Sequence, residues 1–232
     1  MARFGQLISE QSPCKLVLHE QGFGAFSAKA LAKIIREAHQ LVSLDLSLNN
    51  LSLGLEKLFG GIIDNNSLVA VSLRNNSIDG RKFQQQIFDL VFEHPSLASL
   101  NLGNAQTVKN RNRIHNEGLS AILQAVATSK TPSLIQELFL SNSSICSKGL
   151  AHFALIEKHG VHFNLQILDL SFNELGNETP NLIACVIPTL ISLNLASTKM
   201  GSKGALLLAS QLKLAQKKNK WHILRSLDLS NN

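Results

Sequence analysis

The feature that most constrains this chain is an eleven-residue pattern that recurs along its length. Residues 165–175 read Leu-Gln-Ile-Leu-Asp-Leu-Ser-Phe-Asn-Glu-Leu, with leucine at the first, fourth, sixth and eleventh positions and asparagine at the ninth. The alternation around Leu168 and Leu170 predicts a short strand with one buried face, and Asn173 falls where the chain must turn. An asparagine side chain carries donors and an acceptor that can bond the backbone of neighbouring coils.

Copies of this pattern follow one another through the sequence. Taking the first position as the start, they begin at Pro13, Leu41, Leu68, Leu97, Ile135, Leu165, Leu190 and Leu224. One such segment cannot bury its own leucines, so the copies must stack into a solenoid. We therefore expect one repeat domain over residues 13–232, with about eight repeats and the last incomplete, preceded by a lead-in or cap over residues 1–12.

A helical pattern follows each complete strand pattern. The expected helices run over about 28–39, 53–64, 81–93, 117–129, 148–158, 178–187 and 202–216. Ser27, Ser147 and Ser202 are predicted to cap three of these helices at their N-termini. Pro188 is predicted to end the sixth helix.

Coils of 27 to 30 residues leave room for a full helix opposite each strand. This alternation resembles the leucine-rich repeats of the ribonuclease-inhibitor type, which are shared with the Ran GTPase-activating proteins and the repeat domains of NOD-like receptors. The resemblance implies an α/β fold, a right-handed horseshoe-shaped solenoid with parallel strands on the concave side and helices on the convex side. It also implies a protein-binding scaffold with no catalysis of its own.

The fourth copy departs from the pattern. Its turn position holds Ala105, which cannot replace the bonds of an asparagine, and Thr107 stands where an apolar residue is expected. Seven extra residues fit an insertion within 106–116, which contains three cations: Lys109, Arg111 and Arg113. We expect this polar segment to form a protruding and mobile loop.

The eighth copy ends at its turn, at Asn232. Leu227 and Leu229 of its strand would therefore be poorly covered beyond the stack. Either the natural chain continues, or self-association with another copy covers this edge.

The side chains between the leucines should point to the concave side, and most of them are small or polar. The large or charged exceptions form the predicted partner-binding site: Phe139, Glu137, Ile167, Asp169, Phe172 and, as an outlying contact, Arg74. An exposed aromatic side chain with a polar rim is typical of an interface anchor. The alternative is that Phe139 only packs on its strand neighbours.

The net positive charge of the chain is compatible with a second class of function. The chain carries a net charge of +6, whereas the concave columns are acidic on balance, so the excess lies on loops and on the convex side. Its main clusters are the insertion and the group Lys213, Lys217, Lys218 and Lys220. Binding to nucleic acid or to an anionic membrane is an alternative function. The absence of tyrosine and the single tryptophan disfavour it, because single-strand binders stack bases on aromatic side chains.

A GTPase activator of the Ran-activator type is the third hypothesis. It rests on the resemblance and on Arg74-Asn75-Asn76, the one local cluster that could supply polar groups and a charge-stabilising arginine. The long acidic tail typical of that family is missing from this sequence.

No catalytic, cofactor or metal site is expected. His159 and His162 lack a partner set with zinc spacing. Three cysteines (Cys14, Cys146 and Cys185) without a CxxC pair favour a reducing compartment, with Cys185 as a small core residue. No signal peptide and no apolar run near the ~20 residues of a membrane span are visible. We therefore expect a cytoplasmic protein, or a secreted bacterial effector that acts in the host cytosol.

Overall fold

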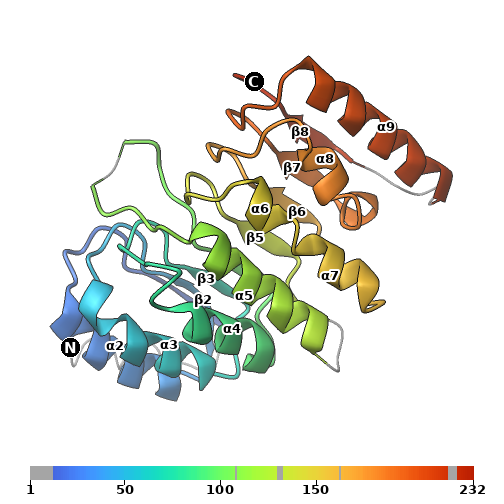
Figure 1. Ribbon diagram of the computed structural model, residues 1–232. Helices are drawn as coiled ribbons and strands as arrows, with labels where there is room; N and C mark the ends of the chain where they lie inside the picture. Colours follow the sequence, from blue (N-terminus) through green and yellow to red (C-terminus); the bar gives the residue numbers. More distant parts are fainter. Residues whose placement is uncertain (1–12, 108, 130–132, 162, 219–223) are drawn as a thin grey trace.

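The computed structural model describes residues 13–107, 109–129, 133–161, 163–218 and 224–232, and it confirms the expected α/β solenoid. Within these residues eight parallel strands form one sheet, in the order in which they occur in the chain (Figure 1). They are β1 (Cys14–Val17), β2 (Leu41–Asp45), β3 (Ala70–Ser72), β4 (Ser99–Asn101), β5 (Glu137–Phe139), β6 (Ile167–Asp169), β7 (Ser192–Asn194) and β8 (Ser226–Asp228). The predicted lead-in over residues 1–12 lies outside the described residues.

The strand register confirms the alignment of the copies. Equivalent apolar residues pair across the sheet, as Leu100 does with Leu138 and Leu138 with Leu168. Leu168 is 1 % exposed and Leu170 is 0 % exposed, as predicted. The strands are short, so the leucines are buried mainly by the coils above and below them.

Helices cover the other side of the sheet (Figure 1). They are α2 (Ala25–Glu37), α3 (Leu55–Ile63), α4 (Gln84–Glu93), α5 (His115–Thr128), α6 (Ser147–Leu150), α7 (Phe153–Lys158), α8 (Thr179–Leu182) and α9 (Ser202–Lys218), with 3₁₀ turns η1 (Ser52–Gly54) and η2 (Ile187–Thr189). The helix expected over 148–158 is divided into α6 and α7. The sixth helix ends at Leu182, before Pro188, which lies inside η2, where its fixed φ angle suits the first turn.

The predicted serine caps are wrong. Helix α2 begins at Ala25, so Ser27 is already helical, and Ser147 and Ser202 are the first residues of α6 and α9. Neither α2 nor α6 has a side-chain hydrogen bond from its own N-cap residue. Neighbouring coils supply acceptors instead: Asn116 Oδ1 accepts the Cys146 N–H at 3.0 Å, and Asn177 Oδ1 accepts the Gly204 N–H at 3.1 Å.

A turn asparagine joins several coils to the one before it, while Ser143 and Thr198 hold the same position in two others. Asn173 makes four backbone bonds of 2.8 to 3.1 Å, to the N–H groups of Ser143 and Ile145 and the carbonyls of Leu140 and Leu170, and a fifth of 3.2 Å to the Ser171 carbonyl. Asn49 and Asn232 make the equivalent bonds to their preceding coils. These amides satisfy backbone groups that would otherwise be buried without partners.

The turn position of the fourth coil is occupied by Asn112, not by Ala105. Asn112 makes the same four bonds: it accepts from the N–H groups of Asn76 (2.8 Å) and Ile78 (2.9 Å) and donates to the carbonyls of Leu73 (2.8 Å) and Leu102 (3.0 Å). Ile114 fills the apolar position expected at Thr107 and is 0 % exposed. The seven inserted residues therefore cover 105–111, which begins one residue before the expected range of 106–116 and otherwise lies within it.

The outward excursion itself is confirmed. The loop leaves the body of the stack beside the other strand-end turns (Figure 1), and Gln106, Thr107 and Lys109 are exposed. Its second half returns to the stack, because Asn112 and Ile114 are fully buried. Mobility is thus expected only before Asn112.

A second buried polar position lies where a helix returns to a strand. Asn65 makes four backbone bonds there, to Ile35, Ala38, Ser67 and Leu68. His94 takes the equivalent place one coil later, and its Nδ1 accepts the Ser96 N–H at 3.3 Å. Its Nε2 is buried and has no hydrogen-bond partner among the described residues. Burial lowers the pKa of His94 from 6.5 to about 4, and the Ile62 carbonyl only partly opposes this shift.

The last strand is poorly covered, as expected. Leu227 is 41 % exposed and Leu229 is partly buried, although Asn232 completes its bonds to the preceding coil. Self-association at this edge stays a prediction.

Candidate functional site

Four of the six predicted binding residues are paired across two adjacent strands, and a fifth follows in the next turn. Glu137 pairs with Ile167, and Phe139 pairs with Asp169, in the central strands β5 and β6. Phe172 lies in the turn that follows β6. All five are half-buried, and we call them the Phe139 patch. The repeat register alone creates this cluster, because equivalent positions of adjacent parallel strands lie about 4.8 Å apart.

Asp169 has a structural role that the sequence reasoning missed. Its Oδ1 accepts the backbone N–H of Ser171 at 2.9 Å and the Ser171 hydroxyl at 2.7 Å. The same Asx turn ends four other strands, at Asp45, Asn101, Asn194 and Asp228. Asp169 is therefore not only a rim charge, since one carboxylate oxygen already stabilises the end of β6. The recurring Asp-x-Ser spacing in the sequence was the signal for this role.

Phe139 occupies this same column but cannot make the turn. Its neighbours across the sheet are Asn101 on one side and Asp169 on the other, and each of them closes its own Asx turn. The phenyl ring thus replaces a structural polar group on the concave side. The Phe139 side chain is half-buried, so it both packs on its strand neighbours and presents part of its ring to solvent.

Phe172 stands at a turn position with a left-handed backbone conformation. Its φ angle is 57°, in the left-handed region, and the equivalent turn position in other coils has the same conformation with varied residues: Leu48 (57°), Asn75 (56°), Asn142 (53°) and Ser197 (54°). Asparagine tolerates this conformation better than an aromatic residue does. Backbone geometry therefore gives no reason for a phenylalanine at this turn.

Arg74 lies apart from the Phe139 patch, just beyond the end of β3, two strands from β5. It is half-buried and forms no ion pair within the described part of the chain. Asn75 and Asn76 are both 0 % exposed. Asn75 bonds Asn104 and the Ala105 N–H, and Asn76 donates to backbone carbonyls. The cluster expected to serve a GTPase activator therefore offers only its arginine to a partner.

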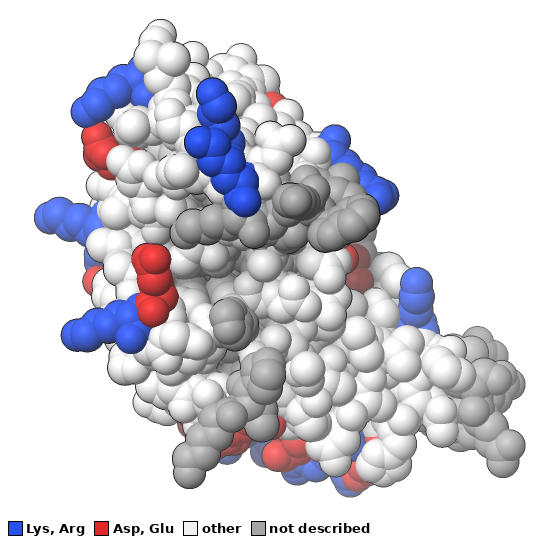
Figure 2. All heavy atoms as spheres, turned by 90° about the vertical axis from the view of Figure 1, so that its right-hand side faces the viewer, with Lys and Arg blue, Asp and Glu red and all other residues white. Residues whose placement is uncertain are grey.

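The basic residues do not form one continuous field on the face drawn in Figure 2. Lysine and arginine side chains are scattered there among uncharged residues, several beside acidic ones. Lys213 and Lys217 of α9 are exposed. The Lys218 side chain and Lys220 lie outside the described residues. Nothing on this face favours nucleic acid or an anionic membrane over a protein partner.

The remaining chemistry-bearing residues are dispersed. The described residues contain no group of three or more metal-ligating side chains, and His162 lies outside them. Cys14, Cys146 and Cys185 carry free thiols. Burial, assisted by the nearby Glu157 carboxylate, raises the pKa of Cys185 to about 11, and its side chain packs against the core as expected.

Comparison with known proteins agrees with the repeat geometry. A model of the Leucine Rich repeat family matches residues 161–178 and 186–209, which include strands β6 and β7. The chain is a leucine-rich repeat protein with strand–helix coils of the ribonuclease-inhibitor type. No curated protein matches its sequence at a significant level. None of the described helices has the length and apolar character required to cross a membrane.

Proposed function

We propose that this protein is a non-catalytic interaction module that binds a partner protein through its concave face. Binding centres on the Phe139 patch, and Arg74 adds an outlying charged contact. The observation that carries the proposal is the replacement of a strand-ending Asx residue by Phe139, beside Ile167 and Phe172. The fold does not require a large apolar side chain at Phe139 or Phe172, whereas aromatic side chains often dominate interface energies.

The dimensions of the concave face suit such a partner. Eight strands at about 4.8 Å spacing give an arc of roughly 35 Å, which can accommodate a standard interface of about 800 Å² per partner. The Phe139 patch lies on β5 and β6, with strands on either side that can complete a polar rim. The expected cytosolic location makes eukaryotic cytosol the first source in which to seek the partner.

The proposal is tested by partner capture followed by titration of variants. Phe139→Ser introduces the residue that Ser72 already supplies at the same column of β3, so the strand should remain intact. We expect this variant to bind at least about tenfold more weakly, since truncated aromatic anchors typically lose ≥2 kcal/mol. Arg74→Ala should have a smaller effect, mainly on the association rate.

Two control variants lie on the helical side of the molecule. Phe26→Ser removes an aromatic ring of α2 that is 97 % exposed, and Lys217→Ala removes an exposed charge of α9. Both should keep full affinity. Full affinity of Phe139→Ser, together with a large loss for either control, would place the binding site off the concave face and refute the proposal.

A further inference from the structure

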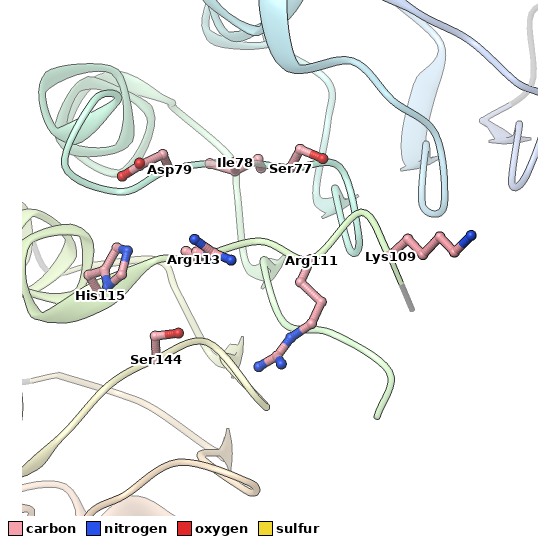
Figure 3. A pocket seen from close by; sticks show the side chains of 8 residues that line it. All are labelled: Ser77, Ile78, Asp79, Lys109, Arg111, Arg113, His115 and Ser144. Carbon is pink, nitrogen blue, oxygen red and sulfur yellow. The ribbon is translucent and has the colours of Figure 1, made fainter. Parts of the chain in front are cut away.

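The insertion forms one wall of an open hollow at the rim of the stack. The hollow has a volume of about 590 Å³ and lies between the turn after β3 and the turn after β5. Figure 3 shows Arg111 and Arg113 between Ser77 and Asp79 on one side and Ser144 on the other. The concave face has no part in this site, so a ligand of the hollow would bind independently of the Phe139 patch.

The hollow has an excess of positive charge. Lys109, Arg111 and Arg113 line it, all three are exposed, and none forms an ion pair within the described part of the chain. Asp79 is the one acidic residue among the described lining residues, and its Oδ1 already accepts the Arg81 N–H at 3.0 Å. His115, the first residue of α5, also lines the hollow, so the positive end of that helix dipole lies at its edge.

Arg111 is oriented before any ligand arrives. Its Nη2 donates to the Asn142 carbonyl at 3.1 Å and also to the Asn142 side-chain oxygen. Asn142 Nδ2 in turn donates to the Ala105 carbonyl at 3.1 Å, at the start of the insertion. A guanidinium group has five N–H donors, so others remain for a ligand. Fixing the arginine in advance lowers the entropic cost of binding.

Backbone bonds hold the cationic segment against the neighbouring coil. Arg113 N–H donates to the Ile78 carbonyl at 2.6 Å, and Gly80 N–H donates to the Arg113 carbonyl at 2.8 Å. The Ser77 N–H donates to the Asn110 carbonyl at 3.1 Å. The coil is complete without residues 105–111, because Asn112 supplies its turn asparagine. The repeat pattern therefore does not require Lys109 or Arg111, and the exposed side chain of Arg113, just after the turn asparagine, makes no hydrogen bond within the described part of the chain.

The lining indicates the chemistry of the ligand. Arginine forks match the oxygens of a phosphoryl group, and several cations suit a dianion better than a single carboxylate. No phenylalanine or tryptophan lines the hollow within the described residues, and its apolar member, Ile78, is 1 % exposed. A nucleobase would find only the His115 ring and the arginine planes to stack on, without a large apolar aromatic surface. The hollow is also wide enough for the backbone of a flexible segment beside the phosphoryl group.

We propose that this hollow binds a phosphate monoester, carried by a phosphorylated serine or threonine of a peptide segment. Arg111 and Arg113 hold the phosphoryl oxygens, and Lys109 adds longer-range attraction. The Ser77 and Ser144 hydroxyls are available as neutral donors on the two walls.

The test uses the full chain and isothermal titration calorimetry with four probes. These are a flexible glycine–serine peptide with one phosphoserine, its unphosphorylated form, inorganic phosphate, and adenosine monophosphate. We expect the phosphopeptide to bind at least tenfold more tightly than the unphosphorylated peptide and more tightly than either small phosphate. Its affinity should fall as salt is added.

Variants locate the site. Arg113→Gln and Lys109→Gln remove charge without removing a side-chain hydrogen bond among the described residues, and Arg113→Gln should weaken phosphopeptide binding at least fivefold. Arg111→Gln should weaken it at least as much. Lys213→Gln removes a matched, unpaired and exposed charge from α9 and should have no effect.

Three results would overturn the proposal. Equal binding of the two peptides would exclude a phosphate site. Equal losses for Lys213→Gln and Arg113→Gln would show only general charge attraction. Tighter binding of adenosine monophosphate than of the phosphopeptide would exclude a peptide as the ligand. None of these results bears on Phe139→Ser, so the two proposals can fail separately.

Discussion

Replacing Asn112 by alanine tests the structural role of the residue that closes the insertion. Asn112 is 0 % exposed, and its amide bonds four backbone groups: the N–H groups of Asn76 and Ile78 and the carbonyls of Leu73 and Leu102. Alanine removes the acceptor and both donors at once. Two N–H groups and two carbonyls then lose these partners in the interior of the stack.

The expected cost is set by those four groups. A buried polar group left unsatisfied costs about 1–3 kcal/mol, and relaxation or entry of water into the small cavity recovers part of it. We therefore expect Asn112→Ala to lower the free energy of unfolding by about 3–5 kcal/mol. With a urea m-value of about 1–3 kcal/mol/M, the unfolding midpoint should fall by at least about 1 M.

Far-UV circular dichroism in a urea series measures this shift, since the chain has one tryptophan and no tyrosine. Asn110→Ala is the matched control, because Asn110 lies in the same insertion and its side chain makes no hydrogen bond within the described structure. Its midpoint should move by less than the equivalent of about 0.5 kcal/mol. Equal midpoints for the two variants would refute the assignment of Asn112 as the turn residue.

Three further perturbations test packing and ionisation. Gly61→Ala should destabilise the α2–α3 contact by about 1–3 kcal/mol, because the new Cβ would lie 2.4 Å from the Ala32 carbonyl oxygen. A Cβ at Gly60 meets open space, so Gly60→Ala should be neutral or mildly stabilising. Equal urea midpoints for the two variants would contradict this prediction. The free energy of unfolding of the wild-type protein should fall by up to about 3 kcal/mol as the pH falls from 6.5 towards 4, because His94 takes up a proton in the unfolded chain but not in the folded state. His94→Asn, which places the residue of Asn65 at the equivalent position, should make the free energy of unfolding less dependent on pH in this range. An unchanged pH dependence would exclude His94 as its source. Leu170→Ala should cost about 2–5 kcal/mol, and a wild-type midpoint would mean that the strand register is wrong.

The strands could be predicted from the sequence because their information is local. Alternating leucines with a turn asparagine define a strand, a buried face and a register within eleven residues. The length excess of the fourth coil also predicted an insertion of the correct size. Its start differs by one residue from the expected range, because Asn112 and not Ala105 is the turn residue. The pair Asn112 and Ile114 repeats the spacing of Asn76 and Ile78, so the correct alignment was already present in the sequence.

The helix starts could not be predicted in the same way because their partners come from other coils. The N–H of Cys146 is satisfied by Asn116, and that of Gly204 by Asn177, from the preceding coil in each case. A capping rule applied to one coil considers only nearby serines. It therefore assigned Ser147 and Ser202 a role that more distant asparagines fill.

Aligning equivalent positions of the repeats predicts part of the candidate sites but not all of it. The adjacency of Phe139 and Asp169 is fixed by register alone, but the Asx turn of Asp169 becomes visible only when its hydrogen bonds are compared with those of Asp45 and Asp228. Where equivalent residues of the repeat share a structural role, a residue that does not fill this role can be replaced without loss of the fold. Phe139 lacks the turn bond, and the exposed side chain of Arg113 makes no hydrogen bond or ion pair within the described part of the chain. Phe139→Ser and Arg113→Gln should therefore keep near-wild-type urea midpoints even where they abolish binding, and a large loss of stability in either would show that the departure from the repeat serves the fold.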